Sequence, residues 1–434
     1  MATTASSEPL SSTIITARGW GVALVGVATG AVGMGIASPV VVYVGVAMVS
    51  ATAVAAVWML LSVHTFLLRF PYARREVAPR PLTVGRPGRV TVGIRSGTAL
   101  TDERGAARQL ARAITAGLDI REQAAAELTG GLGTKATVSR APDALTLSYM
   151  LEPTRRGRWP IGPALVHTSD PFGFLATDTA VGGSERIAVW PATVDLSDAA
   201  GALMGHADRI VLGARTPSPD DASLRDYRDG DDLRRVHWKS TARRGTMLVR
   251  SDERAGRRPA TVIMDLPRDD QAIEWTISAA ASIAVSVLES GHPVRLLGGG
   301  IHPDATGHEH QGSATARAHV LNQTVDLKPP VSANAAENDV LAAARDAAHT
   351  AASGEVTIGV FEPLPKSALD QLVAIGEHGR AWAIVRLNGQ PDHDEAVSDT
   401  VTSLRRAGWR AVTASDSDSL DRVWTTLVTS GDLE

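Results

Sequence analysis

The chain has 434 residues, a formal net charge of -4 and no cysteine. Such a length predicts two or three compact domains, at roughly 150 residues each. The slight excess of acidic residues argues against a surface built throughout to neutralise nucleic-acid phosphates. The absence of cysteine excludes disulfides, zinc–thiolate sites, iron–sulfur clusters and thiol nucleophiles, and it fits a reducing compartment.

Two uncharged apolar segments, residues 20–37 and 40–63, each approach the roughly 20 residues that span a bilayer. Ser38 and Pro39 separate them, which predicts a tight hairpin over residues 17–70, because proline cannot continue the first helix cheaply. Arginines flank the hairpin whereas its turn is uncharged, so the positive-inside rule predicts a two-pass protein of the plasma membrane with both ends cytoplasmic. The flanking arginines are Arg18, Arg69, Arg74 and Arg75.

A secretory signal is the alternative interpretation of the first apolar segment, with cleavage after Gly35 and Ala37. However, a second apolar segment follows at once, and Glu8 lies where a signal peptide is normally basic. Even a cleaved chain would therefore stay anchored. Gly26 and Gly30 form a small-xxx-small pair that would let the two helices approach closely, although glycine is also simply common in membrane helices.

Strand-like segments divided by Gly and Pro follow the hairpin and predict a small β-sandwich over residues 76–197. They are residues 89–94, 134–138, 145–151 and 187–190. Residues 103–128 are richer in Ala, Arg and Gln than a strand should be, so they are either a helical insertion or misleading strands. Residues 1–16 are rich in Ser and Thr and are predicted to be a disordered tail.

Apolar runs alternate with amphipathic helices over residues 259–434, which predicts an α/β domain whose parallel sheet is covered on both faces. Because the crossovers of such a β–α order have one hand, we expect an open, Rossmann-like sheet. A Gly- and His-rich loop is predicted between the second strand and about residue 330. The strands are residues 261–266, 294–297, 356–361, 381–387 and 409–413, and the helices are residues 273–289, 335–352, 367–378, 395–407 and 419–428.

A charged connector, residues 198–258, joins the two predicted domains. Its central part, residues 224–250, reads LRDYRDGDDLRRVHWKSTARRGTMLVR. Together with Asp170-Pro171-Phe172-Gly173 and the stretch RRGRWPIGP at residues 155–163, this part resembles the YxxGDDxRRxHWxxxAR-like signature of a membrane-associated family called domain of unknown function fifty-eight. The signature is specific, and the resemblance covers residues 17–300 in order.

The resemblance implies two N-terminal membrane helices, a β-rich domain and a fold like the von Willebrand factor A domain. It also implies an accessory role, because members of this family resemble proteins encoded beside MoxR-type AAA+ ATPases and, in actinobacteria, beside membrane transglutaminase-like proteins. It implies no catalytic activity, and no cofactor is predicted.

The charged signature has two main interpretations. It is either a clasp that fixes the two domains through ion pairs and stacking on Trp238, or a docking surface for a protein partner. Nucleic-acid or anionic-lipid binding is a weaker third interpretation. Residues 225–258 contain eleven basic and six acidic residues, and a surface of such mixed charge binds phosphate groups poorly. The candidate residues are Arg225, Tyr227, Gly230, Asp231, Asp232, Arg234, Arg235, His237, Trp238 and Arg243.

A metal site of the von Willebrand A type needs Asp-x-Ser-x-Ser after the first strand, because hydroxyls and a carboxylate supply hard oxygen ligands. Here Asp265 is followed by LPRD, so both hydroxyls are missing. The site is degenerate, and Asp265 is expected to be a strand-end or capping residue rather than a ligand.

Three histidines of the glycine-rich loop could in principle hold a metal ion, but no partner at helical spacing would orient them, so a solvated loop is the better account. They are His302, His308 and His310, with Asp304 and Glu309 between them. No Lys-Ser/Thr follows the run Gly298–Gly300, and no Gly-x-Ser-x-Gly elbow occurs. The sequence thus predicts neither a nucleotide site nor a serine hydrolase.

These patterns predict a cytoplasm-facing scaffold, held in the bilayer through residues 20–63, that docks a MoxR-type AAA+ ATPase or an envelope-associated membrane protein. No nucleic acid is expected to bind. One alternative is an enzyme that uses Asp232, His237 and Arg243 in one open pocket. The others are a structural envelope protein with its body outside the cell and a metal-dependent adhesion module.

Overall fold

The computed structural model describes residues 11–69, 72–95, 119–131, 136–141, 144–198, 200–204, 224–226, 241–242, 246–250, 258–301, 314–351, 354–377 and 380–429. The chain divides into two compact units, Met1–Trp190 and Pro191–Glu434, which are described separately. The sequence placed this boundary at residue 197. The difference arises because the backbone N–H groups of Val194 and Leu196 donate hydrogen bonds to serine hydroxyls of a helix in the second unit.

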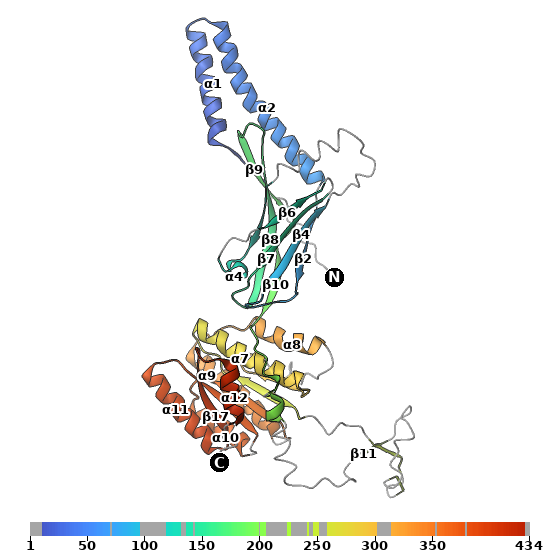
Figure 1. The fold of residues 1–434 in the computed structure, drawn as a ribbon. Coiled ribbons are helices and arrows are strands. Elements are labelled where there is room, and N and C mark those ends of the chain that lie inside the picture. Colours follow the sequence, from blue (N-terminus) through green and yellow to red (C-terminus); the bar gives the residue numbers. More distant parts are fainter. Residues whose placement is uncertain are drawn as a thin grey trace. The chain divides into compact units, whose positions relative to one another are not determined.

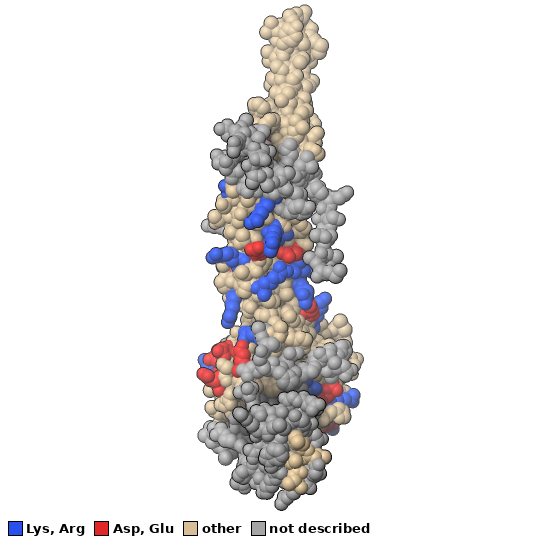
Figure 2. Space-filling model, turned by 90° about the vertical axis from the view of Figure 1, so that its right-hand side faces the viewer, with Lys and Arg blue, Asp and Glu red and all other residues tan. Residues whose placement is uncertain are grey.

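Unit 1 begins with strand β1 (Ser11–Ile15) and the helices α1 (Ala17–Gly35) and α2 (Pro39–Arg69), drawn in blue in Figure 1. Both helices are long and apolar enough to cross a membrane, and only 17% and 11% of their most apolar windows are buried. In Figure 2 the end of the molecule that the helix hairpin forms, at the top, shows no charged side chain. The disorder predicted for residues 1–16 is wrong for β1, which pairs with strand β9 (Leu175–Val181).

The two helices approach closely through glycine. A Cβ atom added to Gly45 would overlap the backbone of Gly26 and Gly30, and one added to Gly33 would overlap the backbone of Val42. The close approach predicted at Gly26 and Gly30 is therefore present, and the small side chains are what allow it.

Two sheets follow and enclose one core. The first has the order β2 (Tyr72–Ala78), β4 (Gly88–Arg95), β7 (Ala144–Leu151), β6 (Thr137–Arg140); the second has the order β1, β9, β8 (Gly157–Ser169), β10 (Glu185–Trp190), β3 (Leu82–Thr83), with β5 (Asp119–Ala124) also paired to β8. All pairs are antiparallel except β3 with β10. Val92 and Leu147 of the first sheet and Val166 of the second belong to the same buried cluster.

The predicted strands of unit 1 correspond to β4, β6, β7 and β10. Strands β2, β3, β8 and β9 were not predicted. In the open region 103–128 the described residues form β5 and a short helix, α4 (Ala126–Thr129), and residues 103–118 lie outside the described residues. Arg75, one of the arginines that flank the hairpin, lies in β2 and forms a buried ion pair with Glu122 (Nε–Oε1 2.5 Å).

Unit 2 contains a five-stranded parallel sheet in the order β14 (Val294–Leu297), β13 (Ala260–Met264), β15 (Val356–Phe361), β16 (Ala381–Leu387), β17 (Arg410–Ser415). Its helices are α7 (Asp270–Glu289), α8 (Ala314–Val325), α9 (Ala333–Ala351), α10 (Lys366–Gly376), α11 (Pro391–Arg406) and α12 (Leu420–Thr429). Strands β11 (Leu224–Asp226) and β12 (Leu248–Arg250) form a separate antiparallel pair.

The open parallel sheet confirms the coarse prediction for this part of the chain. Ile263, Phe361 and Val385 share one buried cluster with helices α9, α10 and α11, while α7 contacts β13, β14 and β15 and α12 contacts β16 and β17. Helix α8 lies where a loop was predicted. Helix α7 also has the length and composition of a membrane span, but 78% of its most apolar window is buried inside unit 2.

Candidate functional site

The chain reverses direction across the parallel sheet at strands β13 and β15. From β13 it moves outward to β14 and then returns past β13 to β15, β16 and β17. In open α/β sheets, ligands bind outside the carboxyl ends of the strands at such a switch point. The polar residues that follow β13 and β15 are Asp265 and Glu362, so these two carboxylates mark the candidate site.

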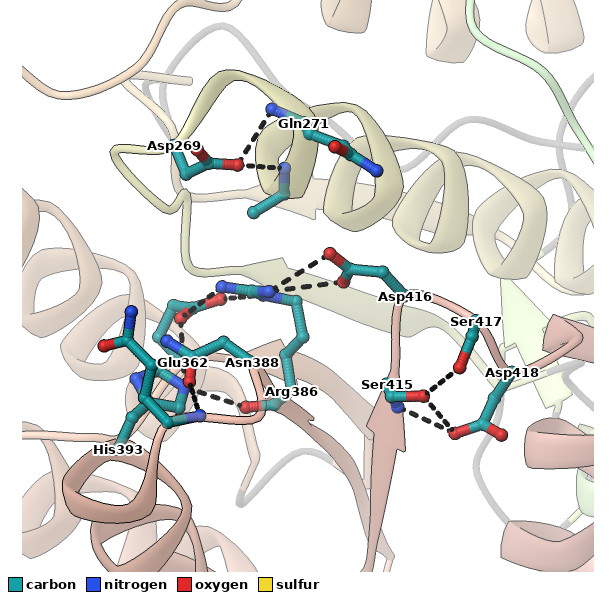
Figure 3. Close-up of polar contacts among 12 residues, drawn as sticks. Asp269, Gln271, Glu362, Arg386, Asn388, His393, Ser415, Asp416, Ser417 and Asp418 are labelled. Carbon is teal, nitrogen blue, oxygen red and sulfur yellow. Dashed lines mark hydrogen bonds and ion pairs between the residues drawn. The ribbon is translucent and has the colours of Figure 1, made fainter.

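Arg386, near the end of β16, binds two of the strand-end carboxylates (Figure 3). Its Nε and Nη2 atoms donate to the two oxygens of Glu362 at 2.5 and 3.0 Å, and its Nη1 donates to Asp416, which follows β17, at 3.2 and 3.4 Å. The side chain of Arg386 is only 5% exposed. Burial alone would lower the pKa of this guanidinium, but the two carboxylates raise it above its usual value.

His393, on α11, completes this cluster of charged and polar groups. Its Nε2 atom lies 3.1 Å from the carbonyl oxygen of Arg386 and 3.6 Å from a carboxylate oxygen of Glu362. Asp418 accepts hydrogen bonds from the backbone N–H and the hydroxyl of Ser415, which hold the pKa of Asp418 below its usual value. The carboxyl edge of the sheet is therefore fixed by interactions within the chain.

Asp265 directly follows β13, as predicted for a strand-end residue, and is only 7% exposed. Its Oδ2 atom accepts a hydrogen bond from the backbone N–H of Glu362 at 3.3 Å. Burial, together with the nearby carboxylates of Glu362 and Asp339, raises the pKa of Asp265 to about 7. The helix cap is Asp269 instead, which accepts from the backbone N–H groups of Ala272 and Gln271 at the start of α7, and these bonds lower its pKa.

A hollow of about 90 Å³ lies beside Asp265 at this edge of the sheet. Asp339, Lys328 and the glycines Gly299 and Gly300 also line it. The hollow offers the amino group of Lys328, the carboxyl group of Asp339 and the carboxyl of Asp265, whose pKa is raised to about 7. Such a set of groups can bind a small polar moiety or exchange a proton. Within the described part of the chain, no group of three or more His, Asp or Glu residues is arranged to hold a metal ion.

Most residues of the predicted charged signature lie outside the described residues. Arg225 belongs to β11, where its backbone pairs with that of Val249 in β12. The histidines and acidic residues of the loop 302–310 are likewise outside the described ranges. The others that are not described are Tyr227, Gly230, Asp231, Asp232, Arg234, Arg235, His237, Trp238 and Arg243.

Sequence reasoning missed Glu362, Arg386, His393 and Asp416. A signal for two of them was present. Arg386 interrupts the otherwise apolar run AWAIVRL, and a charged residue inside a strand that is buried on both faces needs a partner. Glu362 directly follows a predicted strand of the same parallel sheet, so its carboxylate was available at the same edge.

Comparison with known proteins shows that part of the chain is similar to one protein family. The family described as "Protein of unknown function DUF58" matches residues 223–357, which include Asp265 but not Glu362 or Arg386. The uncharacterized protein YeaD of Bacillus subtilis (strain 168) is 26% identical to the chain over 221 residues, which are 49% of this chain and 54% of that protein. The chain thus spans about half the length of this relative.

Replacement of Arg386 by Gln should destabilise unit 2, because it leaves Glu362 and Asp416 without their cation. Removing one partner from a buried ion pair costs roughly 3 kcal/mol or more, and the partial exposure of both carboxylates brings the expectation to the lower end. Arg406→Gln, at an exposed position of α11, is the matched control and should change the free energy of unfolding by about 0.5 kcal/mol or less. Chemical unfolding of both variants measures the difference, and equal stabilities would show that the network contributes nothing.

Replacement of Asp265 by Asn should stabilise unit 2 at alkaline pH. The folded pKa is raised to about 7 from an ordinary value of 3.8, so the stability linked to this proton is fully present below about pH 4 and is lost as the pH rises through 7. Asn can accept the same hydrogen bond but does not ionise. The variant should match the native chain near pH 4 and exceed it at pH 8 by up to about 4 kcal/mol. Thermal unfolding across this range is the measurement, and parallel curves for the two proteins would contradict the assignment.

Proposed function

Since the chain is a protein of the DUF58 family, whose description assigns no activity, we propose from its own structure that it is a membrane-tethered scaffold that docks a protein partner. The observation that carries the proposal is a contrast in burial. Helices α1 and α2 expose most of their apolar windows, whereas α7, which is also long and apolar enough to span a membrane, has 78% of its most apolar window buried inside unit 2. Exposed apolar surface of this extent marks a membrane or protein interface, and two helices of this length suit a bilayer.

The topology that we propose has two spans, with both ends and both folded units on the cytoplasmic side. The short connection of residues 36–38 between the helices carries no charge, whereas Arg18 precedes α1 and Arg69 ends α2. Positively charged residues on the flanks of a hairpin favour the cytoplasm.

A cysteine-free chain allows this topology to be tested with single cysteines. Ser38→Cys, in the turn, should react with a membrane-impermeant maleimide on intact cells. Glu152→Cys, exposed in unit 1, should react only after the cells are lysed. The reverse pattern would place the folded body outside the cell and support a structural envelope protein.

The proposed docking surface is the charged signature of residues 224–250, with the carboxyl edge of the sheet as a second contact. Two features support this choice. The family match includes both the signature and the switch-point residue Asp265. At the edge of the sheet, Glu362 and Asp416 are already paired with Arg386, which favours recognition over catalysis by these carboxylates. We further propose that unit 2 is related in fold to the von Willebrand factor A domain.

The partner that we propose is a MoxR-type AAA+ ATPase or an envelope-associated membrane protein such as a transglutaminase-like protein. This choice is supported by the resemblance of the signature to that of accessory proteins of such ATPases. A signature of mixed charge with Tyr227 and Trp238 has the composition of a protein interface, in which arginine and aromatic residues dominate the binding energy.

Crosslinking and capture from membranes test the docking. The native chain should capture a specific ATPase or membrane protein, and a variant with Arg234→Ala, Arg235→Ala and Trp238→Ala should lose at least tenfold of it, because interface arginines and tryptophans each contribute about 2 kcal/mol or more. The matched control removes two exposed cations of unit 2, Lys366→Ala and Arg406→Ala, and should capture as well as the native chain.

The melting temperature of each variant decides how a loss of capture is interpreted. A stably folded triple variant that no longer binds supports a docking surface. A triple variant that unfolds shows that the signature is a clasp. Equal capture by the triple variant and the control contradicts docking at the signature.

A further inference from the structure

The turn between β8 and β9, residues 170–174, is attached to the beginning of helix α1. The backbone N–H of Thr16 donates to the carbonyl oxygen of Phe174 at 2.8 Å, and its hydroxyl donates to the carbonyl oxygen of Gly173 at 2.7 Å. The same hydroxyl accepts a hydrogen bond from Gly19 and so caps α1. The N-terminus of the first apolar helix and this turn are therefore one bonded structure.

The turn itself is rigid. Asp170 is buried, and its carboxylate accepts hydrogen bonds from the backbone N–H groups of Phe172 at 2.9 Å and Leu175 at 2.6 Å. A Cβ atom added to Gly19 would overlap the carbonyl oxygen of Phe174, so α1 lies directly against the turn. On the other helix, Ala55 and Met59 bury Leu175 together with Val63 and Phe174.

The ring of Phe172 nevertheless remains 60% exposed, and it stacks on Phe174 with 5.5 Å between the ring centroids. A large apolar side chain on a fixed turn exposes surface that water disfavours. Ile14 and Ile15, on the adjoining strand β1, are 59% and 48% exposed. Because successive side chains of a strand point to opposite faces, only one of the two isoleucines can face the start of α1, and it is Ile15, whose Cγ2 atom lies against Gly19. Phe172 and Ile15 are therefore exposed apolar side chains beside the first turn of α1, and they are called the apolar patch.

Two tryptophans indicate where the bilayer ends. Trp20 follows Gly19, which touches the turn, and Trp58 precedes Met59, which packs on Leu175. Both indoles are about half exposed, at 56% and 48%. Tryptophan concentrates at the membrane–water interface. The turn therefore lies at the level of two candidate interface residues.

The lengths of the two helices place the membrane boundary at the same position as the tryptophans do. The 19 residues of α1 extend about 28 Å, close to the roughly 30 Å of a hydrocarbon core, so Thr16 falls at its boundary. The 31 residues of α2 extend about 46 Å, so its last turns continue beyond that boundary, where α2 contacts β9. The guanidinium of Arg18 lies beside Gly173 of the turn, where a cation can meet lipid phosphate.

We propose that the turn of residues 170–174 is a membrane-interface anchor: Phe172 inserts at the headgroup–acyl boundary of the bilayer that holds α1 and α2, with Ile15 and the cation Arg18 beside the same helix terminus. The proposal rests on the membrane tether of the proposed function. The occupant of the patch is lipid, because the patch adjoins the start of an exposed apolar helix and lies at the level of the tryptophans and of the helix terminus. The anchor fixes the sheets of unit 1 to the membrane surface.

Single cysteines in the full chain, labelled with an environment-sensitive fluorophore in liposomes of neutral and anionic phospholipid, test this anchor. Phe172→Cys should be quenched more strongly by a lipid quencher near the headgroup than by one deep in the acyl chains. Val46 is exposed and lies about two turns after the beginning of α2, within the proposed span. Val46→Cys should therefore be quenched more strongly by the deep quencher than by the one near the headgroup. Glu152→Cys should not be quenched, since the 13 residues of β8 place about 40 Å between the turn and that end of the sheet.

Pro171→Cys keeps the phenylalanine ring and guards against perturbation by the label at residue 172; it should give the same order of quenching as Phe172→Cys. If Val46→Cys is quenched but neither turn position is, the tether stands and the anchor is wrong. Crosslinking from residue 172 to a second copy or to a protein would then identify the occupant. If Val46→Cys itself is not quenched, the membrane tether of the proposed function fails.

Discussion

At the carboxyl edge of the parallel sheet in unit 2, the ends of the strands are held together by one cation, Arg386. Arg386 extends from β16 to carboxylates that follow β15 and β17, so a single guanidinium ties the ends of three neighbouring strands. Three acidic side chains, Asp265, Glu362 and Asp416, follow strands at this edge, and without a positive charge their mutual repulsion would oppose ionisation. Arg386 resolves the repulsion for two of them. The pKa of Asp265 is instead raised to about 7, chiefly by burial and further by the nearby carboxylates of Glu362 and Asp339.

This arrangement has a consequence for binding. An edge that gathers carboxylates usually needs a cation from solution, but this chain supplies one from its own sheet, where it is held by bidentate hydrogen bonds. The groups left to interact with a partner are then Lys328, Asp339 and the titrating carboxyl of Asp265 around the hollow. Binding of a cationic or hydrogen-bond-donating group there would favour ionised Asp265, so we expect any such interaction to strengthen as the pH rises through neutrality.

The sequence predicted best the parts that are governed by local pattern. Strands buried on both faces of a parallel sheet form continuous apolar runs, and the predicted bounds of β14, β15 and β16 match the structure. Strands β8 and β9 contain Gly, Pro and Thr at many positions, so they lack such a run, and their pairing is set by partners distant in sequence. The same reason explains Arg386: its ion pairs join residues 24 and 30 positions apart, which no local spacing reveals.

The contrast between α2 and α7 shows that hydropathy alone does not predict whether an apolar helix is buried inside a folded unit or exposed. Both helices satisfy the length and composition of a membrane span. Helix α7 carries Ser282 and Ser286, whose hydroxyls accept hydrogen bonds from the backbone N–H groups of Val194 and Leu196. These serines hold an adjoining segment against the helix, and the opposite side of α7 covers the sheet, so its apolar surface is satisfied by protein. Among the side chains that the structure describes, the apolar surface of α2 is covered only by α1 and by the cluster at Leu175. Because both helices meet the criteria for a span while only α7 is buried inside its unit, the proposed tether is confined to the N-terminal helices, and α7 belongs to the core of unit 2.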